Sequence, residues 1–280
     1  DFHINKPENN QNDPDALTSA RNNGTKEVRN GFGSSLFRYA KEVNDAYDPI
    51  SGTKKALFPA RQYMMTYLVR WMIDFHIDGI RLDSIENVFN WDFMRDFKDF
   101  ARNLWNQRWN SQGLSTPSSE ANSRFLVVGE ELTVPKEIVR QRVLDGLWNE
   151  DFKKYIRAVI IGQNAANEPS FEWTVRKAID SREMGFTDAS QAIIYLTSHD
   201  VEGFRNERLY NFLGTIYEKK QRIQLAFVCL LTAVGIPMIL AGDEFADEHD
   251  RFDRDGNVSQ SGGKQVDPVN FSRLEGSNNQ

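Results

Sequence analysis

The sequence contains the stretch IDGIRLD at residues 77–83, a short apolar run that ends at an acidic residue. The same pattern returns in FLVVGE at residues 125–130 and in IIYLTSHD at residues 193–200. A strand with one solvated face alternates between apolar and polar residues, whereas the runs FLVV and IIYL are continuously apolar. Such runs are typical of parallel strands covered on both faces. The three stretches therefore predict buried strands of a parallel sheet.

Apolar residues recur at helical spacing between these strands. The segment that begins at Pro59, a residue suited to the first turn of a helix, places Met64, Leu68, Met72 and Phe75 on one helical face. Further helices are predicted at residues 90–109, 153–160 and 218–234, and further strands at residues 144–152 and 236–242. Strands that alternate with helices are characteristic of βαβ units, so we expect an α/β fold.

The beginning of the chain differs from the rest in composition. Residues 1–58 are rich in Asn, Asp, Gly and Ser, which is typical of a long loop or a small excursion from the main core. We therefore expect residues 1–58 to form a polar excursion and residues 59–280 to form the main α/β core.

Charge and hydropathy argue against several kinds of partner. The 280 residues carry 34 Lys and Arg against 40 Asp and Glu, a net charge of −6, so we expect no nucleic-acid partner. The longest apolar run, at residues 225–241, is interrupted by Gly235 and Pro237 and is too short for a membrane span, so we expect no membrane partner. Cys229, the only cysteine, is expected to be a buried hydrophobic residue, and a single cysteine fits a reducing compartment such as the cytoplasm.

Two polar patterns were considered as metal sites. The acidic stretch GDEFADEHDRFDRDGN at residues 242–257 fails the spacing of a calcium loop, because Arg251 and Gly262 fall at the first and last ligand positions. We expect a solvated loop beside the active site instead. The four histidines show no paired spacing, which argues against a zinc enzyme. No metal and no cofactor are therefore expected.

Each of the three predicted strands leads to a carboxylate, namely Asp83, Glu130 and Asp200. In parallel α/β barrels the C-terminal strand ends carry the chemistry, so the three side chains are expected to converge on one mouth. A retaining glycosidase needs such a set, with one nucleophile, one general acid/base and a third carboxylate that assists. The alternative is that each carboxylate only caps the helix that follows.

Longer stretches around these carboxylates resemble the α-amylase superfamily of glycoside hydrolases. GIRLDSIENV at residues 79–88 resembles the nucleophile strand, FLVVGEEL at residues 125–132 the acid/base strand, and YLTSHD at residues 195–200 the third catalytic segment. GIPMILAGDEF at residues 235–245 resembles the eighth strand. The motifs occur in the family's order. They imply a (β/α)8 TIM barrel of the α-amylase type whose active site is carried by residues 59–280.

The start of the chain matches the family only in part. DFHINK at residues 1–6 resembles the third-strand motif Asp-x-x-x-Asn-His, but Lys6 stands in place of the histidine. On this alignment the chain begins at strand three, lacks the first βα units of a complete barrel, and uses residues 1–58 as the excursion between strand three and helix three. Asn5 falls at a position that many amylases link to calcium, and no metal site is assigned to it.

The resemblance implies a role for each matched residue. Asp83 would attack the anomeric carbon and form a covalent glycosyl-enzyme, and Glu130 would protonate the leaving oxygen. Arg81 lies two residues before Asp83, on the same side of the strand, where its charge would keep the nucleophile ionised. Asp200 and His199 would hydrogen-bond sugar hydroxyls in the transition state.

Glu131 is a rival for the acid role of Glu130. Consecutive residues of a strand face opposite sides, so only one of the two glutamates can face the mouth. The match to the family's Gly-Glu pair favours Glu130.

The resemblance thus implies a retaining glycoside hydrolase that acts on α-1,4 or α-1,6 linked glucans, with an α-glucan oligo- or polysaccharide as its partner. Glu86 and Asn87 stand where many amylases have a Lys-His pair, and DGLWNEDF and AGDEF resemble the isoamylase, branching-enzyme and trehalohydrolase side of the superfamily. Two alternatives stay open. An α-glucan transferase uses the same carboxylates with a sugar as acceptor, and a non-catalytic glucan-binding protein would keep the scaffold alone.

Overall fold

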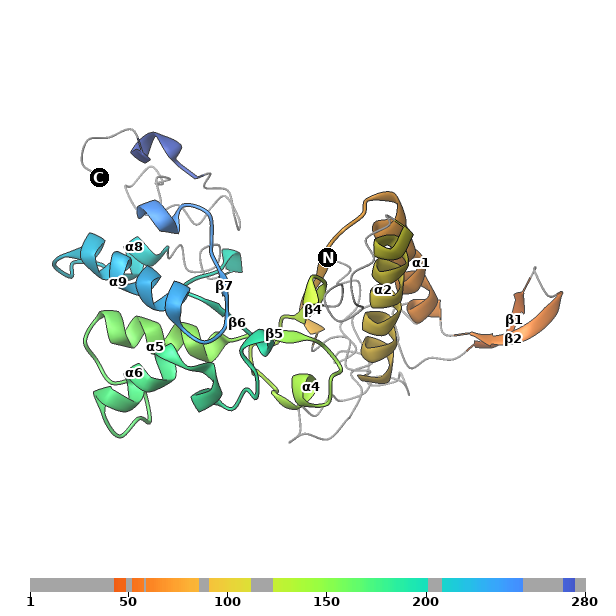
Figure 1. The fold of residues 1–280 in the computed structure, drawn as a ribbon, viewed down its shortest axis with the longest axis horizontal. Helices are drawn as coiled ribbons and strands as arrows, with labels where there is room; N and C mark the ends of the chain where they lie inside the picture. The colour runs from red at the N-terminus through yellow and green to blue at the C-terminus, as the bar shows by residue number, and fades with distance from the viewer. Residues whose placement is uncertain are drawn as a thin grey trace, which may run out of the picture. The chain divides into compact units, whose positions relative to one another are not determined.

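The computed structural model describes residues 43–48, 52–57, 59–85, 91–111, 123–200, 208–248 and 269–274. The chain divides into two compact units (Figure 1). The first comprises Asp1–Glu131 and Pro135–Leu147, and the second comprises Leu132–Val134 and Trp148–Gln280. Each unit combines parallel strands with helices, as the sequence predicted.

A β-hairpin lies within the predicted excursion of residues 1–58. β1 (Val43–Asp48) pairs antiparallel with β2 (Thr53–Leu57), and Gly52 precedes β2 with a φ of 66°. A left-handed residue at a turn favours glycine, which has no Cβ to clash. Asn5 lies outside the described residues.

Three parallel strands form the sheet of the first unit. β3 (Gly79–Leu82) pairs with β4 (Leu126–Gly129) along its whole length, and β4 pairs with β5 (Gly146–Trp148). The last residue of β5 already belongs to the second unit. Because parallel strands run in the same direction, their C-terminal ends meet at one edge of the sheet.

Two long helices of the first unit pack against each other, namely α1 (Pro59–Asp74) and α2 (Trp91–Ser111). Leu68 and Met72 of α1 are buried, as predicted. The prediction for Phe75 is wrong, because α1 ends one residue before it and its side chain is 54% exposed.

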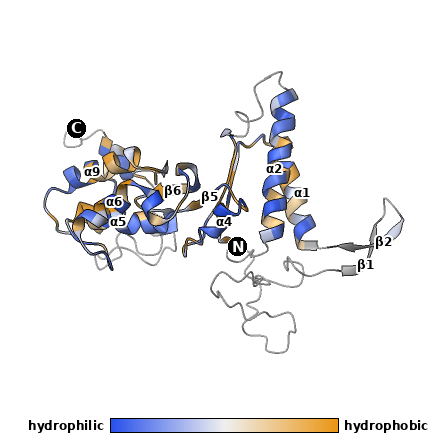
Figure 2. Cartoon of the chain, turned by 60° about the horizontal axis from the view of Figure 1, so that its bottom comes forward, coloured by the Kyte–Doolittle hydropathy of each residue, from blue (hydrophilic) through white to orange (hydrophobic). Residues whose placement is uncertain are grey.

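Aromatic residues fix α2 against the rest of its unit. Trp105 stacks on Phe125, the residue before β4, with ring centroids 5.5 Å apart. Hydrophilic residues dominate α2 in Figure 2 and are interrupted by hydrophobic patches. These patches supply its buried side chains, which include Phe93, Met94, Phe97 and Ala101. The short helix α4 (Glu137–Arg140) lies in the connection from β4 to β5.

In the second unit, β6 (Ala192–Tyr195) and β7 (Ile236–Met238) pair in parallel. All four residues of β6 are buried, as expected for a continuous apolar strand. The chain that leaves β5 joins this sheet, because the backbone N–H of Asn149 donates to the carbonyl of Ile193 over 2.8 Å.

The described part of the second unit contains the helices α5 (Glu150–Ile160), α6 (Phe171–Ile179), α8 (Leu209–Phe212) and α9 (Lys219–Thr232) and the short turns η4 (Ser181–Met184), η5 (Ala189–Gln191), η6 (Asp243–Phe245) and η7 (Phe271–Leu274). The sequence predicted α5 and α9. It did not predict α6, whose buried residues are the small side chains of Thr174 and Ala178. Cys229 of α9 is only partly buried, so the expectation of a buried residue is wrong.

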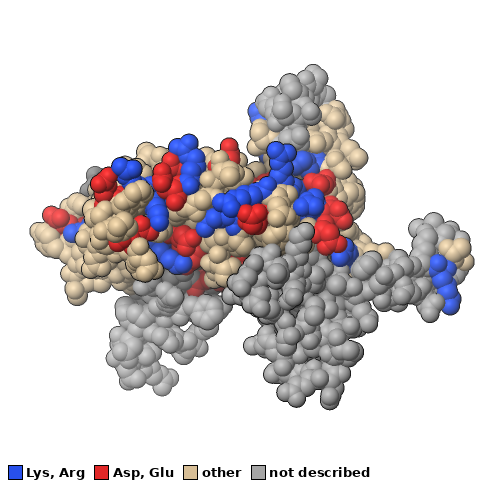
Figure 3. All heavy atoms as spheres, turned by 90° about the horizontal axis from the view of Figure 1, so that it is seen from below, with Lys and Arg blue, Asp and Glu red and all other residues tan. Residues whose placement is uncertain are grey.

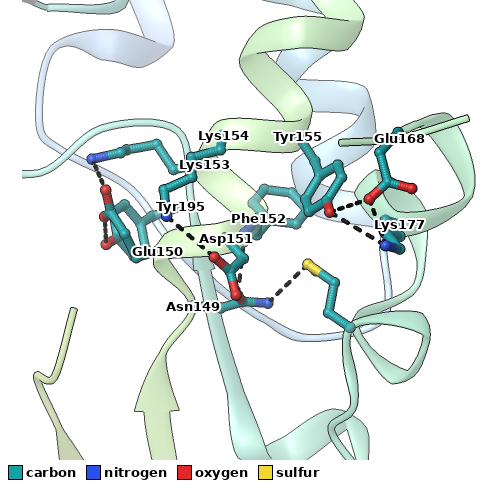
Figure 4. Close-up of polar contacts among 11 residues, drawn as sticks. Asn149, Glu150, Asp151, Phe152, Lys153, Lys154, Tyr155, Glu168, Lys177 and Tyr195 are labelled. Carbon is teal, nitrogen blue, oxygen red and sulfur yellow. Dashed lines mark hydrogen bonds and ion pairs between the residues drawn. The ribbon is translucent and has the colours of Figure 1, made fainter. Parts of the chain in front are cut away.

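Polar side chains tie the start of α5 to β6 (Figure 4). Asn149 caps the helix by accepting a hydrogen bond from the backbone N–H of Phe152 over 3.1 Å. Glu150 accepts a hydrogen bond from the hydroxyl of Tyr195 over 2.6 Å and pairs with Lys153 at 2.5 Å. The contact between Tyr195 and Glu150 therefore fixes the last residue of β6, shortly before His199 and Asp200 in the chain.

Acidic and basic side chains are interspersed on the surface shown in Figure 3. Exposed ion pairs of the chain include Arg140–Glu137 and Arg176–Glu172, each at 2.8 Å. Among the helices that the structure describes, none combines the length and the apolar character that a membrane crossing requires.

Candidate active site

Asp83 and Glu130 follow neighbouring strands at the same level. The parallel register pairs Leu82, the last residue of β3, with Gly129, the last residue of β4. Asp83 and Glu130 come next in the chain, so both carboxylates lie at the C-terminal edge of the sheet. This is the edge where α/β folds carry their catalytic groups.

Arg81 joins the two carboxylates. Its Nη2 atom lies 2.9 Å from Oδ1 of Asp83 and 2.5 Å from Oε2 of Glu130. Arg81 and Asp83 are two residues apart, so their side chains lie on the same side, as predicted. The side chain of Glu130 is 10% exposed and that of Asp83 is 64% exposed. The cluster therefore combines a shielded carboxyl with one that solvent reaches.

The buried position of Glu130 changes the acidity of its carboxyl group. Its pKa is raised to about 7, first by burial and next by a hydrogen bond with the side chain of Asp83. The positive charge of Arg81 and the backbone N–H of Ser84 act in the opposite direction on this pKa. A carboxyl that is about half protonated at neutral pH can both donate and accept a proton, as a general acid/base must.

The contact between the two carboxyls restricts the chemistry they can do. Asp83 and Glu130 both contact one nitrogen of Arg81. Inverting glycosidases separate their carboxyl groups by about 6.5–9.5 Å to admit a water, whereas retaining enzymes keep them about 5–5.5 Å apart. The shared contact with Nη2 of Arg81 keeps the two carboxyls close together, nearer to the spacing of retaining enzymes than to that of inverting ones.

In the second unit, β6 leads into His199 and Asp200. Nε2 of His199 lies 3.7 Å from Oδ2 of Asp200, and the two side chains are 40% and 35% exposed. Trp148, which is buried, packs edge-on against His199 with ring centroids 6.1 Å apart and contacts Tyr195 at 5.2 Å. The His-Asp pair is thus accessible to solvent but rests on a buried aromatic base.

The structure brings the predicted site residues together in two groups. Arg81, Asp83 and Glu130 form a cluster in the first unit, and His199 and Asp200 form a pair in the second. Each group follows the C-terminal end of a parallel strand, as the sequence patterns predicted. The expectation of a buried strand is wrong for β3, whose residues are exposed or half-buried, and is confirmed for β6.

Three residues bear on the alternatives left open by the sequence. Glu131, the rival acid, is itself 3% exposed. Its orientation away from the mouth stays a prediction. Glu86 and Asn87, which replace the family's Lys-His pair, lie outside the described residues.

A buried ion cluster in the second unit was missed by the sequence analysis. In this Arg208 cluster, Arg208 lies 3.9 Å from Asp243 and 3.5 Å from Asp247, and Arg273 lies 3.5 Å from Asp247. The side chains of Arg208, Asp243 and Asp247 are no more than 4% exposed. Burial raises the pKa of Asp243 to about 7, against the opposing charge of Arg208.

The prediction of a solvated loop is therefore wrong for Asp243 and Asp247. Both belong to the acidic stretch at residues 242–257, but arginines from outside that stretch accompany them into the interior. No local pattern signals this burial, since the partners lie elsewhere in the chain. Within the described ranges, no group of three or more His, Cys, Asp or Glu side chains is arranged to hold a metal ion.

The chain is similar in sequence to known proteins of one family. The family model for the α-amylase catalytic domain matches residues 1–269. Over 210 residues the chain is 21% identical to a malto-oligosyltrehalose trehalohydrolase of Saccharolobus solfataricus. This alignment covers 68% of this chain and 35% of that protein. Over 204 residues it is 24% identical to the 1,4-alpha-glucan branching enzyme GlgB of Cellvibrio japonicus. This alignment covers 66% of this chain and 26% of that enzyme.

Solved structures show the same fold at low identity. A pullulanase type I from Bacillus subtilis complexed with maltose has a TM-score of 0.55 and 18% identity, over 84% of this chain and 33% of that one. A pullulanase from Anoxybacillus sp. LM18-11 complexed with maltotetraose has a TM-score of 0.54 and 17% identity, over 89% and 34% of the two chains.

The chain spans about a quarter to a third of the length of the curated relatives named above. Its parallel strands and intervening helices form part of a (β/α)8 barrel, so the predicted fold class is confirmed. The chain belongs to the α-amylase catalytic domain family.

Proposed function

We propose that this chain carries the catalytic groups of a retaining enzyme that cleaves α-1,4 or α-1,6 linked glucans. The observation that carries the proposal is the contact of Arg81 with both Asp83 and Glu130, at 2.9 and 2.5 Å. One carboxyl is exposed, the other is shielded with a pKa of about 7, and both touch one fixed positive charge. This asymmetry suits a nucleophile and a general acid that work as a pair.

In the first step, Asp83 attacks the anomeric carbon while the bond to the leaving oxygen breaks. Glu130 gives its proton to that oxygen, so the leaving sugar departs as an alcohol and a covalent glycosyl-enzyme remains. Arg81 balances the negative charge that the two carboxyls share.

In the second step, the ionised Glu130 takes a proton from a water molecule, whose oxygen attacks the anomeric carbon and releases Asp83. The product is a free sugar, and Glu130 is again protonated. His199 and Asp200 bind sugar hydroxyls, with hydrogen bonds that strengthen in the transition state.

Transfer to a sugar acceptor is the second candidate. Its chemistry is the same except that a sugar hydroxyl replaces water in the second step. The curated relatives include several branching enzymes named GlgB, which supports this candidate. The difference between the two lies in which acceptor reaches the glycosyl-enzyme.

Incubation with maltoheptaose and with glycogen, followed by reducing-end and branch analysis, tests both candidates. New reducing ends without new branches indicate hydrolysis, and new branches without a rise in reducing ends indicate transfer. The Asp83→Asn variant serves as the inactive control. Binding of maltoheptaose with no new products in either assay would contradict both candidates and indicate a glucan-binding protein.

A further inference from the structure

Glu130 is held from three sides by the end of β3 and the turn that follows. Its backbone N–H donates to the carbonyl of Leu82 over 2.9 Å, and its own carbonyl accepts from the N–H of Ile85 over 3.0 Å. Between these two contacts, the backbone N–H of Ser84 donates to Oε2 of Glu130 over 3.2 Å. The turn therefore binds both the backbone and the side chain of Glu130.

Ser84 has an unusual backbone conformation for its residue type. Its φ is 45°, in the left-handed region that favours glycine. A single left-handed residue turns the chain sharply, and here the turn carries the N–H of Ser84 to the carboxyl of Glu130. Such conformations persist only where the surroundings impose them, and they gather at functional sites.

The neighbouring strand supplies that constraint at Gly129. A Cβ atom on Gly129 would lie 2.6 Å from Cδ1 of Ile85 and 2.7 Å from Cδ1 of Leu144. Both side chains are 1% exposed, so they have little room to move aside. The absence of a side chain at Gly129 lets Ile85 pack directly on the backbone of β4. This packing holds the turn at Ser84 against the strand that leads to Glu130.

We propose that the backbone N–H of Ser84, held by this turn, is a positioning group that fixes the proton of the general acid on Oε1 of Glu130. Oε2 already accepts hydrogen bonds from Nη2 of Arg81 and from the N–H of Ser84. A carboxyl oxygen that accepts two N–H donors is a poor site for a proton, so the neutral acid carries it on the other oxygen. The inference rests on the proposed role of Glu130 as the acid.

The same contact limits how far the pKa of Glu130 can rise. The N–H of Ser84 stabilises the ionised carboxylate and so opposes the effect of burial. Without it, the acid would hold its proton to a higher pH and would be slower to act as the base of the second step.

Replacing the amide between Asp83 and Ser84 by an ester, with an α-hydroxy acid in place of Ser84, removes this N–H and keeps both side chains. We expect the pH at which Glu130 titrates in the full chain to rise by about one to two units, as for loss of a hydrogen bond to a charged group. Carbon-13 NMR of the labelled carboxyl, assigned with Glu130→Gln, measures this without any need for activity.

A pair of ordinary substitutions gives an independent test. Ser84→Ala loses the hydroxyl but keeps the N–H, so the titration of Glu130 should stay as in the unsubstituted chain. Ser84→Val adds a β-branched side chain that disfavours the left-handed conformation, so the titration should move upward as in the ester. Ser84→Gly suits this conformation and should leave the titration unchanged while raising the melting temperature.

The outcomes separate this inference from the proposed function. A titration that stays the same in the ester and in Ser84→Val would overturn the positioning role, even if the chain cleaves glucans. An upward shift in both would support it, even if the chain proves inactive. A lower melting temperature in Ser84→Val without any shift would mark the turn as structural only, and would also overturn the inference.

Discussion

Among the residues that the structure describes, two carboxylic acids have a pKa of about 7, one in each unit, and their surroundings differ. Glu130 lies at the end of β4, where its partner Asp83 is 64% exposed and Arg81 contacts both. Asp243 lies after β7 with a side chain that is 2% exposed, and Arg208, 3.9 Å away, is 4% exposed. The first acid has a neighbour that solvent reaches, whereas the second is enclosed with its counter-charge.

The difference shows what a raised pKa can and cannot identify. Burial is the largest cause for both residues, so the value alone does not separate a catalytic acid from a structural one. A catalytic acid also needs a path by which its proton reaches a substrate. The exposed Asp83 beside Glu130 marks such a path, and the Arg208 cluster has no comparable open member among Arg208, Asp243 and Asp247.

The largest effect is expected at the exposed member of the first cluster. Asp83→Asn removes the attacking charge with little change in shape, so turnover should fall roughly 10⁴-fold or more, as for loss of a covalent nucleophile. The melting temperature should stay the same or rise slightly, because one of two adjacent carboxyls is neutralised. Turnover on maltoheptaose and a thermal melt measure both. Near-normal turnover would contradict the retaining mechanism.

The next effect separates the acid from its neighbour in the chain. Glu130→Gln should slow cleavage of natural glucans by about 10²- to 10⁴-fold, because their leaving oxygen needs a proton. Formation of the glycosyl-enzyme from an activated aryl glycoside should be spared, because that leaving group departs without help. Comparing initial rates on the two substrates tests this.

Glu131→Gln is the matched control for that comparison. If Glu131 faces away from the mouth, this variant should show no dependence on the leaving group. A leaving-group-dependent loss in Glu131→Gln, with none in Glu130→Gln, would show that the acid is the other residue of the pair.

Substitutions in the Arg208 cluster should lower the free energy of unfolding and leave turnover on glucans less affected. Asp247→Asn leaves the buried Arg208 without its counter-charge and should cost about 3 kcal/mol, as for breaking a buried ion pair. Asp243→Asn should cost less than about 1 kcal/mol at pH 6, because Asp243 is already mostly neutral there. Urea unfolding at pH 6 measures both costs. Equal costs would show that Asp243 is ionised in the folded chain.

The sequence predicted the elements that rest on one strong local pattern. The strands β4 and β6 are continuous apolar runs, and the carboxylates that follow β3, β4 and β6 are expected from the direction of those strands. The pairing of Arg81 with Asp83 follows from the two-residue repeat of a strand. The catalytic roles of these residues, by contrast, stay predictions.

Features that depend on distant partners were not predictable. The sequence gives no sign that Asp243 and Asp247 are buried, because Arg208 and Arg273 supply the reason from elsewhere in the chain. The left-handed turn at Ser84 has no glycine to signal it and is imposed by packing on the next strand. Both features arise from tertiary contacts that override local preference.

The smallest expected effect is the pH dependence of stability, which should be similar for Glu130 and Asp243. Glu130 and Asp243 have a folded pKa of about 7, above the usual 4.5 and 3.8, so the folded state holds their protons more tightly than the unfolded chain. Their contribution to stability is therefore complete below about pH 4 and is lost as pH rises through about 7. Glu130→Gln and Asp243→Asn cannot ionise, so from pH 5 to pH 8 each should gain about 2.5 kcal/mol relative to the unsubstituted chain. Urea unfolding at four pH values across this range measures the gain.

The control is Asp188→Asn, whose carboxyl has a lowered pKa because Ser190 donates to it, and it should show no such gain above pH 5. A gain in Asp243→Asn but not in Glu130→Gln would mean that Glu130 is ionised throughout, and the acid role proposed for it would fail.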